Sequence, residues 1–439
     1  MFIPTTQKEL KQLGWNELDV ILVTGDTYID SPYIGISVIG KTLIKNGFRV
    51  GIIAQPDCNS DKDISRLGEP RLFWGVSAGS VDSMVANYTA LKKKRQQDDF
   101  TPGGTNDKRP DRASMFYTNL IRRYFKNTAP VVLGGIEASL RRITHYDFWS
   151  NKVRKPILFD AKADYLVYGM GERSVLQLAE KLKNGESAAD VNGLCYISRE
   201  ENPEYLTLPS FDQAVADKKL FVKMFDTFHQ NNDPLNAKGL QQKIDDRYLI
   251  QNPPAQYLSQ PELDEVHDLD FERNVHPFYG KNGKVKALDT IRFSIPSHRG
   301  CYGDCNFCAI TVHQGRTVRW RSEKSIVNEA KIMARQKDFK GNISDVGGPT
   351  ANMYGFECAK KLKSGACKDK RCLFPEPCKG LKTNHSKQIT LLEKLKQVEK
   401  VKRVFVASGL RYDMVLDDKK FGHKYFEVLV KDHVSGQLK

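Results

Sequence analysis

Apolar runs and amphipathic stretches alternate along the first half of the chain. Two apolar runs, at residues 19–24 and 50–54, flank an amphipathic stretch from Ile36 to Lys45, and Gly47 follows that stretch. This order is typical of strand, helix and strand, because apolar positions three and four apart form one helix face and glycine favours a helix end. The alternation continues with three more apolar runs, at residues 73–76, 131–133 and 165–168. We therefore predict an α/β fold, with an N-terminal Rossmann-like, doubly wound sheet over residues 1–197.

The alternation weakens after residue 197 and returns near residue 289. Residues 198–288 are predicted to form an irregular region that bridges two domains. From there onward, short β-rich runs again alternate with helical stretches, which is the spacing of a (β/α) barrel. Residues 289–439 reach only the approach to a fourth strand, so the pattern predicts an incomplete barrel. Because an open barrel leaves an unpaired edge, we expect the sequence to be a piece of a longer protein.

In one segment of the first domain, the apolar residues follow no periodic spacing. Residues 92–112 are rich in charged and turn-forming residues, which predicts an exposed, solvated insertion. Open α/β sheets bind ligands beyond their strand ends, so a lid over such a site is the alternative interpretation.

Composition and charge narrow the class of protein. Hydrophobic residues make up 40% and charged residues 28% of the 439 residues, which excludes a wholly disordered chain. No apolar stretch approaches the length of a bilayer span, and the N-terminus lacks the layout of a signal peptide, so we expect a cytoplasmic protein without a membrane partner. The net charge of +15 lies wholly in residues 291–439, which hold 30 Lys and Arg against 15 Asp and Glu. Such a field attracts nucleic acid and small anionic cofactors alike.

The cysteines carry the candidate chemistry. Seven of the nine lie between residues 301 and 378, and in a reducing compartment such clustering indicates metal ligation. The first three, Cys301, Cys305 and Cys308, follow a predicted strand at a spacing that suits an iron–sulfur cubane with one iron left open. The alternative is a zinc site completed by His298 or His313.

The segment around these cysteines, SHRGCYGDCNFCAITVHQGRTVRW, resembles the signature of the radical S-adenosylmethionine (SAM) superfamily. Four further stretches resemble the YgiQ-type family of radical SAM proteins: GDTYIDSPYIGISVIGKTL (25–43), VVLGGIEASLRR (131–142), DYLVYGMGE (164–172) and GGPTANMYG (347–355). The resemblance implies a [4Fe-4S] cluster on the three cysteines, SAM bound at its open iron, and reductive cleavage of SAM to a 5′-deoxyadenosyl radical. It also implies an electron donor such as flavodoxin or ferredoxin.

The same resemblance implies which residues contact SAM: Phe307, Gly347, Gly348, Ser408 and Arg411. The aromatic ring would pack near the adenine, and the two glycines would approach the amino group with their backbone. The serine and arginine would contact the ribose or the carboxylate. Pro349 stands where the superfamily's glycine motif usually has an acidic residue, so the resemblance supports a backbone role there.

Two further cofactor questions follow from the residues. The N-terminal domain resembles cobalamin-binding domains, but the loop from Gly25 to Gly35 has no histidine to serve as an axial ligand, and we do not expect cobalamin among the cofactors. The second cysteine group comprises Cys358, Cys367, Cys372 and Cys378. These four residues could bind zinc, bind a second cluster or remain free thiols, and the sequence does not choose among the three.

The sequence therefore predicts a radical SAM enzyme that acts on an unidentified substrate. Two alternatives remain open. The positive charge of residues 291–439 favours an RNA-modifying radical SAM methyl- or methylthiotransferase. The same charge, together with the cysteines, would also suit a non-catalytic, zinc-stabilised nucleic-acid-binding protein.

Overall fold

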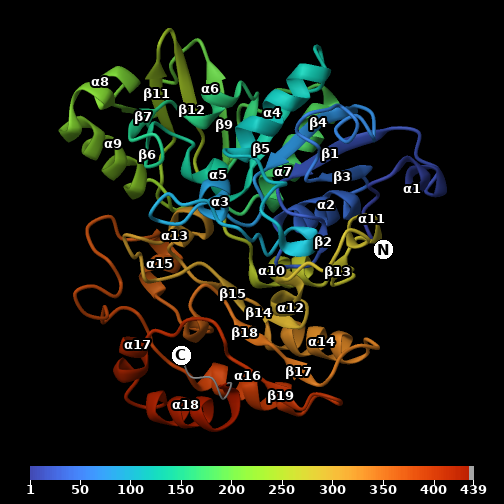
Figure 1. The fold of residues 1–439 in the computed structure, drawn as a ribbon. Helices are drawn as coiled ribbons and strands as arrows, with labels where there is room; N and C mark the ends of the chain where they lie inside the picture. The colour runs from blue at the N-terminus through green and yellow to red at the C-terminus, as the bar shows by residue number, and fades with distance from the viewer. Residues whose placement is uncertain (435–439) are drawn as a thin grey trace. The chain divides into compact units, whose positions relative to one another are not determined.

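The chain divides into two compact units in the computed structural model, which describes residues 1–434. The first unit is Met1–Ala255 with Asp270–Ala287, and the second is Gln256–Leu269 with Leu288–Lys439 (Figure 1). The domain boundaries drawn from the sequence differ from these, chiefly because most of the region between residues 198 and 288 belongs to the first unit.

A nine-stranded sheet forms the centre of the first unit, in the order β10-β11-β12-β9-β8-β5-β4-β1-β3. Its parallel part comprises β1 (Leu18–Thr24), β3 (Val50–Ala54), β4 (Pro70–Ser77), β5 (Val131–Gly134) and β8 (Tyr165–Val167). All residues of β1 and β3 are buried, as expected for parallel strands covered on both faces. The predicted α/β class is confirmed.

Helices connect the parallel strands: α2 (Gly35–Lys45), α3 (Ser83–Asn87), α4 (Ala113–Tyr124), α5 (Gly135–Leu140), α6 (Ile157–Ala161) and α7 (Glu172–Asn184). The first of these buries Ile36, Val38 and Leu43 on one face, and Gly47 follows its end with a φ of 84°. The strand order reverses between β1 and β4, since β3 pairs with one side of β1 and β4 with the other. Ligands of open α/β sheets bind beyond the carboxyl ends of strands at such a switch point.

The far edge of the sheet comes from the region that the sequence predicted to be irregular: β9 (Leu194–Ser198), β10 (Leu206–Leu208), β11 (Leu240–Ile244) and β12 (Arg247–Gln251). Polar residues at buried positions hide the strand pattern here. The side chain of Gln241 donates to Thr207 Oγ1 at 2.9 Å, and that of Gln242 donates to the carbonyl of Pro209 at 2.9 Å. Hydrogen bonding lets these glutamines be buried where the sequence pattern predicts solvent.

The second unit contains short parallel strands with helices between them. β14 (Ser294–Pro296) pairs with β18 (Asp345–Gly347), and β17 (Asn342–Ile343) pairs with β19 (Arg403–Val404). The connecting helices are α14 (Glu323–Ala334) and α16 (Ser386–Lys396), followed by α17 (Tyr412–Asp417) and α18 (Gly422–Val428). Their apolar faces share one core with the strands, which includes Ile295, Ile343, Leu392 and Val404.

A two-residue ladder completes the second unit near its cysteines. β15 (His298–Arg299) pairs antiparallel with β16 (Arg319–Trp320) and so closes the loop that carries the first three cysteines. Among the described residues, no helix is both long enough and apolar enough to span a membrane.

Candidate functional site

The loop between β15 and β16 holds the first cysteine group. Cys301 is buried, whereas Cys305 and Cys308 are half-buried. The loop is fixed by its own backbone: the N–H of Cys301 donates to the carbonyl of Gly315 at 3.3 Å. Gly300 has a φ of 80°, and a Cβ at this position would lie 2.5 Å from the carbonyl oxygen of Thr317. Both features favour glycine there.

Two of the three sulfur atoms face one glycine. A Cβ on Gly303 would lie 3.3 Å from Cys301 Sγ and 3.4 Å from Cys305 Sγ. The N–H of Gly303 donates to Cys301 Sγ at 3.3 Å, and Thr350 Oγ1 lies 3.4 Å from the same sulfur. Burial raises the pKa of the Cys301 thiol in the metal-free protein, so binding of a metal would release its proton.

The described residues present no preformed site for a single metal ion. Throughout residues 1–434, no three His, Cys, Asp or Glu side chains are arranged to hold one metal ion. A cubane separates its thiolates farther than one zinc ion does. His298, expected as a zinc ligand in the alternative interpretation, lies against Gly348, whose Cβ would be 2.7 Å from the imidazole Nε2. Burial lowers the pKa of His298 to about 4.

The glycines that follow β18 are packed against side chains of the same unit. A Cβ on Gly347 would lie 3.0 Å from Ser408 Oγ, and a Cβ on Gly348 would overlap the His298 ring. The carbonyl of Gly347 accepts hydrogen bonds from the backbone N–H and the hydroxyl of Ser297, at 2.6 and 3.0 Å. The structure therefore places Gly347 next to Ser408.

Ser408 is oriented by a residue that the sequence analysis missed. Asp345, at the start of β18, accepts a hydrogen bond from the Ser408 hydroxyl. Its other oxygen accepts from the backbone N–H groups of Ala407 and Ser408, at 2.8 and 3.2 Å. Its position two residues before the Gly347–Gly348 pair was the only available signal.

Arg411 lies beside the cysteine loop. Its Nη1 donates to Cys305 Sγ at 3.7 Å, and its other nitrogens donate to Asp413, at 3.0 Å from Nε and at shorter range from Nη2. Hydrogen bonding with Asp413 raises the pKa of the Arg411 guanidinium and lowers that of the carboxyl group. Buried Asn352, also missed by the sequence analysis, bonds to the backbone N–H and carbonyl of Arg411, both at 2.9 Å.

Phe307 differs from the other predicted SAM contacts. Its side chain is 92% exposed, so the structure does not bring it against Arg411, Ser408 or the glycines. Of the remaining predicted residues, the structure brings Cys301 and Cys305 together with Arg411, and Gly347 together with Ser408. Gly348 lies against His298, and the N–H of Cys308 donates to the Cys305 carbonyl at 3.0 Å.

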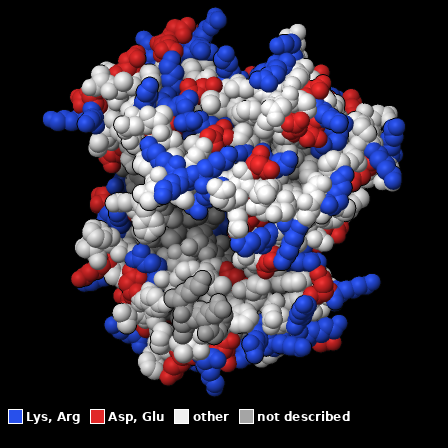
Figure 2. All heavy atoms as spheres, viewed as in Figure 1, with Lys and Arg blue, Asp and Glu red and all other residues white. Residues whose placement is uncertain are grey.

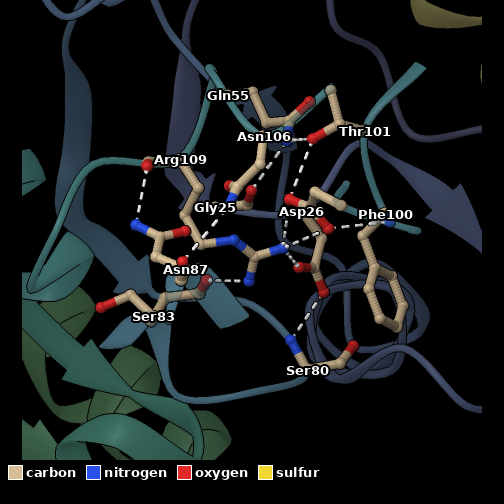
Figure 3. Close-up of polar contacts among 12 residues, drawn as sticks. Gly25, Asp26, Gln55, Ser80, Ser83, Asn87, Phe100, Thr101, Asn106 and Arg109 are labelled. Atoms are coloured by element: carbon tan, nitrogen blue, oxygen red, sulfur yellow. Dashed lines mark hydrogen bonds and ion pairs between the residues drawn. The ribbon is translucent and has the colours of Figure 1, made fainter. Parts of the chain in front are cut away.

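The switch point of the first unit is filled by the chain itself. Arg109, from the segment predicted to be a solvated insertion, is buried beyond β1 and β4 (Figure 3). Its Nη2 lies 2.7 Å from Asp26 Oδ1 and 3.0 Å from Asp98 Oδ2, and its Nη1 donates to the Ala78 carbonyl at 3.2 Å. Burial raises the pKa of Asp26, while Arg109 opposes that shift. The prediction of a fully solvated insertion is therefore wrong, because part of the segment supplies the buried polar groups that close this edge.

Comparisons with known proteins give the family context. A family model described as Radical SAM N-terminal matches residues 2–294. UPF0313 protein FN0734 of Fusobacterium nucleatum is 60% identical over 439 residues, which cover 100% of this chain and 77% of the relative. UPF0313 proteins of Thermotoga maritima and Methanocella arvoryzae are 51% and 48% identical, covering 100% and 99% of this chain and 77% and 72% of the relatives.

Two solved structures resemble the fold at low identity. The radical SAM methyltransferase TsrM from Kitasatospora setae, with cobalamin and a [4Fe-4S] cluster bound, gives a TM-score of 0.47 at 16% identity and covers 90% of this chain and 56% of its own. The cobalamin-dependent SAM radical enzyme OxsB gives 0.44 at 13% identity, with 91% and 45% covered. Both of these structures have cobalamin bound, which contradicts the expectation that cobalamin is not among the cofactors. That expectation rested on one missing histidine in Gly25–Gly35, and the lack of one axial ligand does not exclude a cofactor that other contacts hold.

Proposed function

The chain belongs to the UPF0313 family of radical SAM-related proteins, and on that premise we propose that it is a radical SAM enzyme whose Cys301, Cys305 and Cys308 hold a [4Fe-4S] cluster. We further propose that it is of the YgiQ type. Such a cluster supplies, when reduced, the electron that cleaves SAM to methionine and a 5′-deoxyadenosyl radical. The observation that carries the proposal is the placement of Cys301 and Cys305 on either side of Gly303, with the Arg411 guanidinium against Cys305.

The side chains around the cysteines have separable roles in this proposal. Arg411 provides a positive charge for the SAM carboxylate, and Asp413 and Asn352 hold that guanidinium and its backbone in place. Asp345 fixes the Ser408 hydroxyl, which would face the ribose. Gly347 and Gly348 keep the backbone after β18 free of side chains, so that SAM could approach it closely.

The test of this proposal uses the full chain, purified and reconstituted without oxygen. Iron, sulfide and zinc are measured per chain, and EPR spectra of the reduced protein are recorded with and without SAM. We expect a four-iron signal that changes when SAM is added, and we expect this SAM-sensitive part of the spectrum to be lost in C301A/C305A/C308A. The matched control is Cys58→Ala, since Cys58 is half-buried in the first unit. Bound zinc with no SAM-sensitive iron signal would reject the proposal.

Partners and location remain predictions from the sequence. On the face shown in Figure 2, the Lys and Arg side chains of each unit are interspersed with acidic ones. An RNA-modifying role is the second candidate, and its support is the net positive charge of residues 291–439. A flavodoxin or ferredoxin as electron donor, and a cytoplasmic location, follow from the family resemblance and the composition.

A further inference from the structure

The second cysteine group lies in the segment from Glu357 to Lys382, most of which has neither helix nor strand. After α15 (Ala359–Ser364), residues 365–384 form only turns, bends and one isolated bridge. That bridge joins Glu357 to Lys382, whose N–H donates to the Glu357 carbonyl at 2.8 Å, so the two ends of the segment meet. Segments of this length without regular structure are uncommon inside compact domains and need another source of order.

The sulfur atoms at the two ends of this segment face a common glycine. A Cβ on Gly380 would lie 3.7 Å from Cys378 Sγ and 3.9 Å from Cys358 Sγ. Between them, the N–H of Cys378 donates to the carbonyl of Cys372 at 2.8 Å. The arrangement repeats that of Gly303, which faces Cys301 and Cys305 in the first group.

A buried lysine gives an independent reason to expect negative charge here. Lys361 is only 2% exposed, its Nζ donates to the Arg316 carbonyl at 2.5 Å, and it lies 5.1 Å from the Tyr302 ring centroid. Its positive charge opposes the burial that raises the pKa of the Cys372 thiol. Among the residues described, its ammonium has no carboxylate partner. A buried cation without an anion is costly, and a set of thiolate ligands would supply the missing negative charge.

The segment also contacts the first cysteine loop directly. Arg316 Nη2 donates to the Cys367 carbonyl at 3.2 Å, and Arg371 Nη2 donates to Asn306 Oδ1 at 2.6 Å. Cys301, Cys358 and Cys372 belong to one buried cluster of side chains. Order in the second segment would therefore be transmitted to the loop that holds the first group.

We propose that Cys358, Cys367, Cys372 and Cys378 hold a second iron–sulfur cluster. The sulfur atoms of Cys358 and Cys378 face Gly380 as those of Cys301 and Cys305 face Gly303, so we assign the same kind of group to both cysteine sets. Four thiolates leave the cluster negatively charged, and Lys361 beside Cys372 and Lys370 beside Cys378 provide compensating charge. This site is separate from the proposed SAM site.

The experiment is metal analysis of the full-length C301A/C305A/C308A variant, reconstituted with iron and sulfide without oxygen. We expect about half of the iron and sulfide of the unmodified chain to remain, with an EPR signal of the reduced form that SAM does not change. Zinc in place of iron, or no metal at all, would overturn the second cluster. Whether SAM alters the EPR signal of the unmodified chain tests the proposed function independently.

Substitution in the second group provides the reciprocal test. Cys378→Ser is preferred because Cys378 is only partly buried, whereas replacing buried Cys358 or Cys372 risks unfolding. We expect this variant to lose iron while keeping the SAM-sensitive signal, and its circular dichroism spectrum to match that of the unmodified chain. Cys195→Ser, a buried thiol in the first unit, is the control and should keep all iron. Full iron retention in Cys378→Ser and in Lys361→Met would contradict the assignment.

Discussion

The guanidinium of Arg109 joins the carboxylate of Asp26, which follows β1, to the inserted segment that carries Asp98. All three side chains are buried, and the two carboxylates lie within 3.0 Å of the same guanidinium nitrogen. A segment of charged and turn-forming residues is thereby fixed over the carboxyl end of the sheet.

Removal of this guanidinium should destabilise the first unit. Arg109→Met leaves two buried carboxylates without their partner, and we expect a loss of about 3–5 kcal/mol of unfolding free energy. Chemical denaturation measures the change. Lys394→Met, which breaks an exposed pair with Glu323, is the control and should cost less than about 1 kcal/mol. Equal losses in both variants would show that Arg109 is not a structural bridge.

Hydrogen exchange provides a second test of the ion pairs that Arg109 forms with Asp26 and Asp98. In Arg109→Met, backbone N–H groups that the inserted segment protects, such as those of Asp98 and Thr101, should exchange faster than in the unmodified chain. Exchange in α14, which belongs to the second unit, should stay the same. Unchanged exchange in residues 92–112 would mean that other contacts hold the segment.

A second prediction concerns the glycines after β18. Gly348→Ala would bring a Cβ to 2.7 Å from the His298 ring and 2.8 Å from the His298 carbonyl, so the backbone must move. We expect a stability loss of about 1–3 kcal/mol and weaker SAM binding. Gly409→Ala is the matched control, because a Cβ there has no neighbour within 4 Å. Thermal unfolding and SAM titration of the two variants should separate them clearly.

The charge at Arg411 provides a third prediction. Arg411→Met removes a charge-assisted contact to the SAM carboxylate, so about ten-fold or more SAM should be needed for the same EPR change. Iron content should be retained, because the arginine is not a cluster ligand in the proposal. Arg403→Met, an exposed change on β19 of the same unit, should leave the SAM titration unaltered. Matching titrations in the two variants would remove Arg411 from the site.

His298 makes the second unit sensitive to acid. Burial lowers its pKa to about 4 in the folded state, whereas the unfolded chain binds a proton near pH 6.5. The contribution of neutral His298 to the free energy of unfolding is therefore fully present above pH 6.5 and is lost as the pH falls toward 4. The total loss is roughly 3 kcal/mol. Denaturation of metal-free protein between pH 7 and pH 4.5 measures this loss. His298→Gln should flatten the profile, and an unchanged slope would contradict the assignment.

The sequence predicted those parts of the fold that local patterns encode. β1 and β3 are buried throughout and consist mostly of apolar residues, and the spacing of Cys301, Cys305 and Cys308 is short enough to read along the chain. Such features depend on neighbours within a few residues.

Long-range contacts explain what the sequence did not predict. Asp345 meets Ser408 only because β18 lies next to the strand that precedes Ser408, and Asn352 meets Arg411 across 59 residues. Nothing in the charged pattern of residues 92–112 identifies Arg109 as buried, since its partner Asp26 lies 83 residues away. Polar side chains that hydrogen-bond to partners far along the chain produce no periodic pattern of residue types in the sequence.

The ladder between β15 and β16 has a consequence for the order of assembly. It closes the first cysteine loop with backbone hydrogen bonds, and the Cys301 N–H bond to Gly315 reinforces that closure, so none of these contacts uses a cysteine sulfur. The conformational entropy of the loop is therefore lost during folding and does not have to be overcome again when iron arrives. With the proposed cluster, a newly made chain would fold first and bind iron and sulfide afterwards, in a loop whose backbone is already ordered.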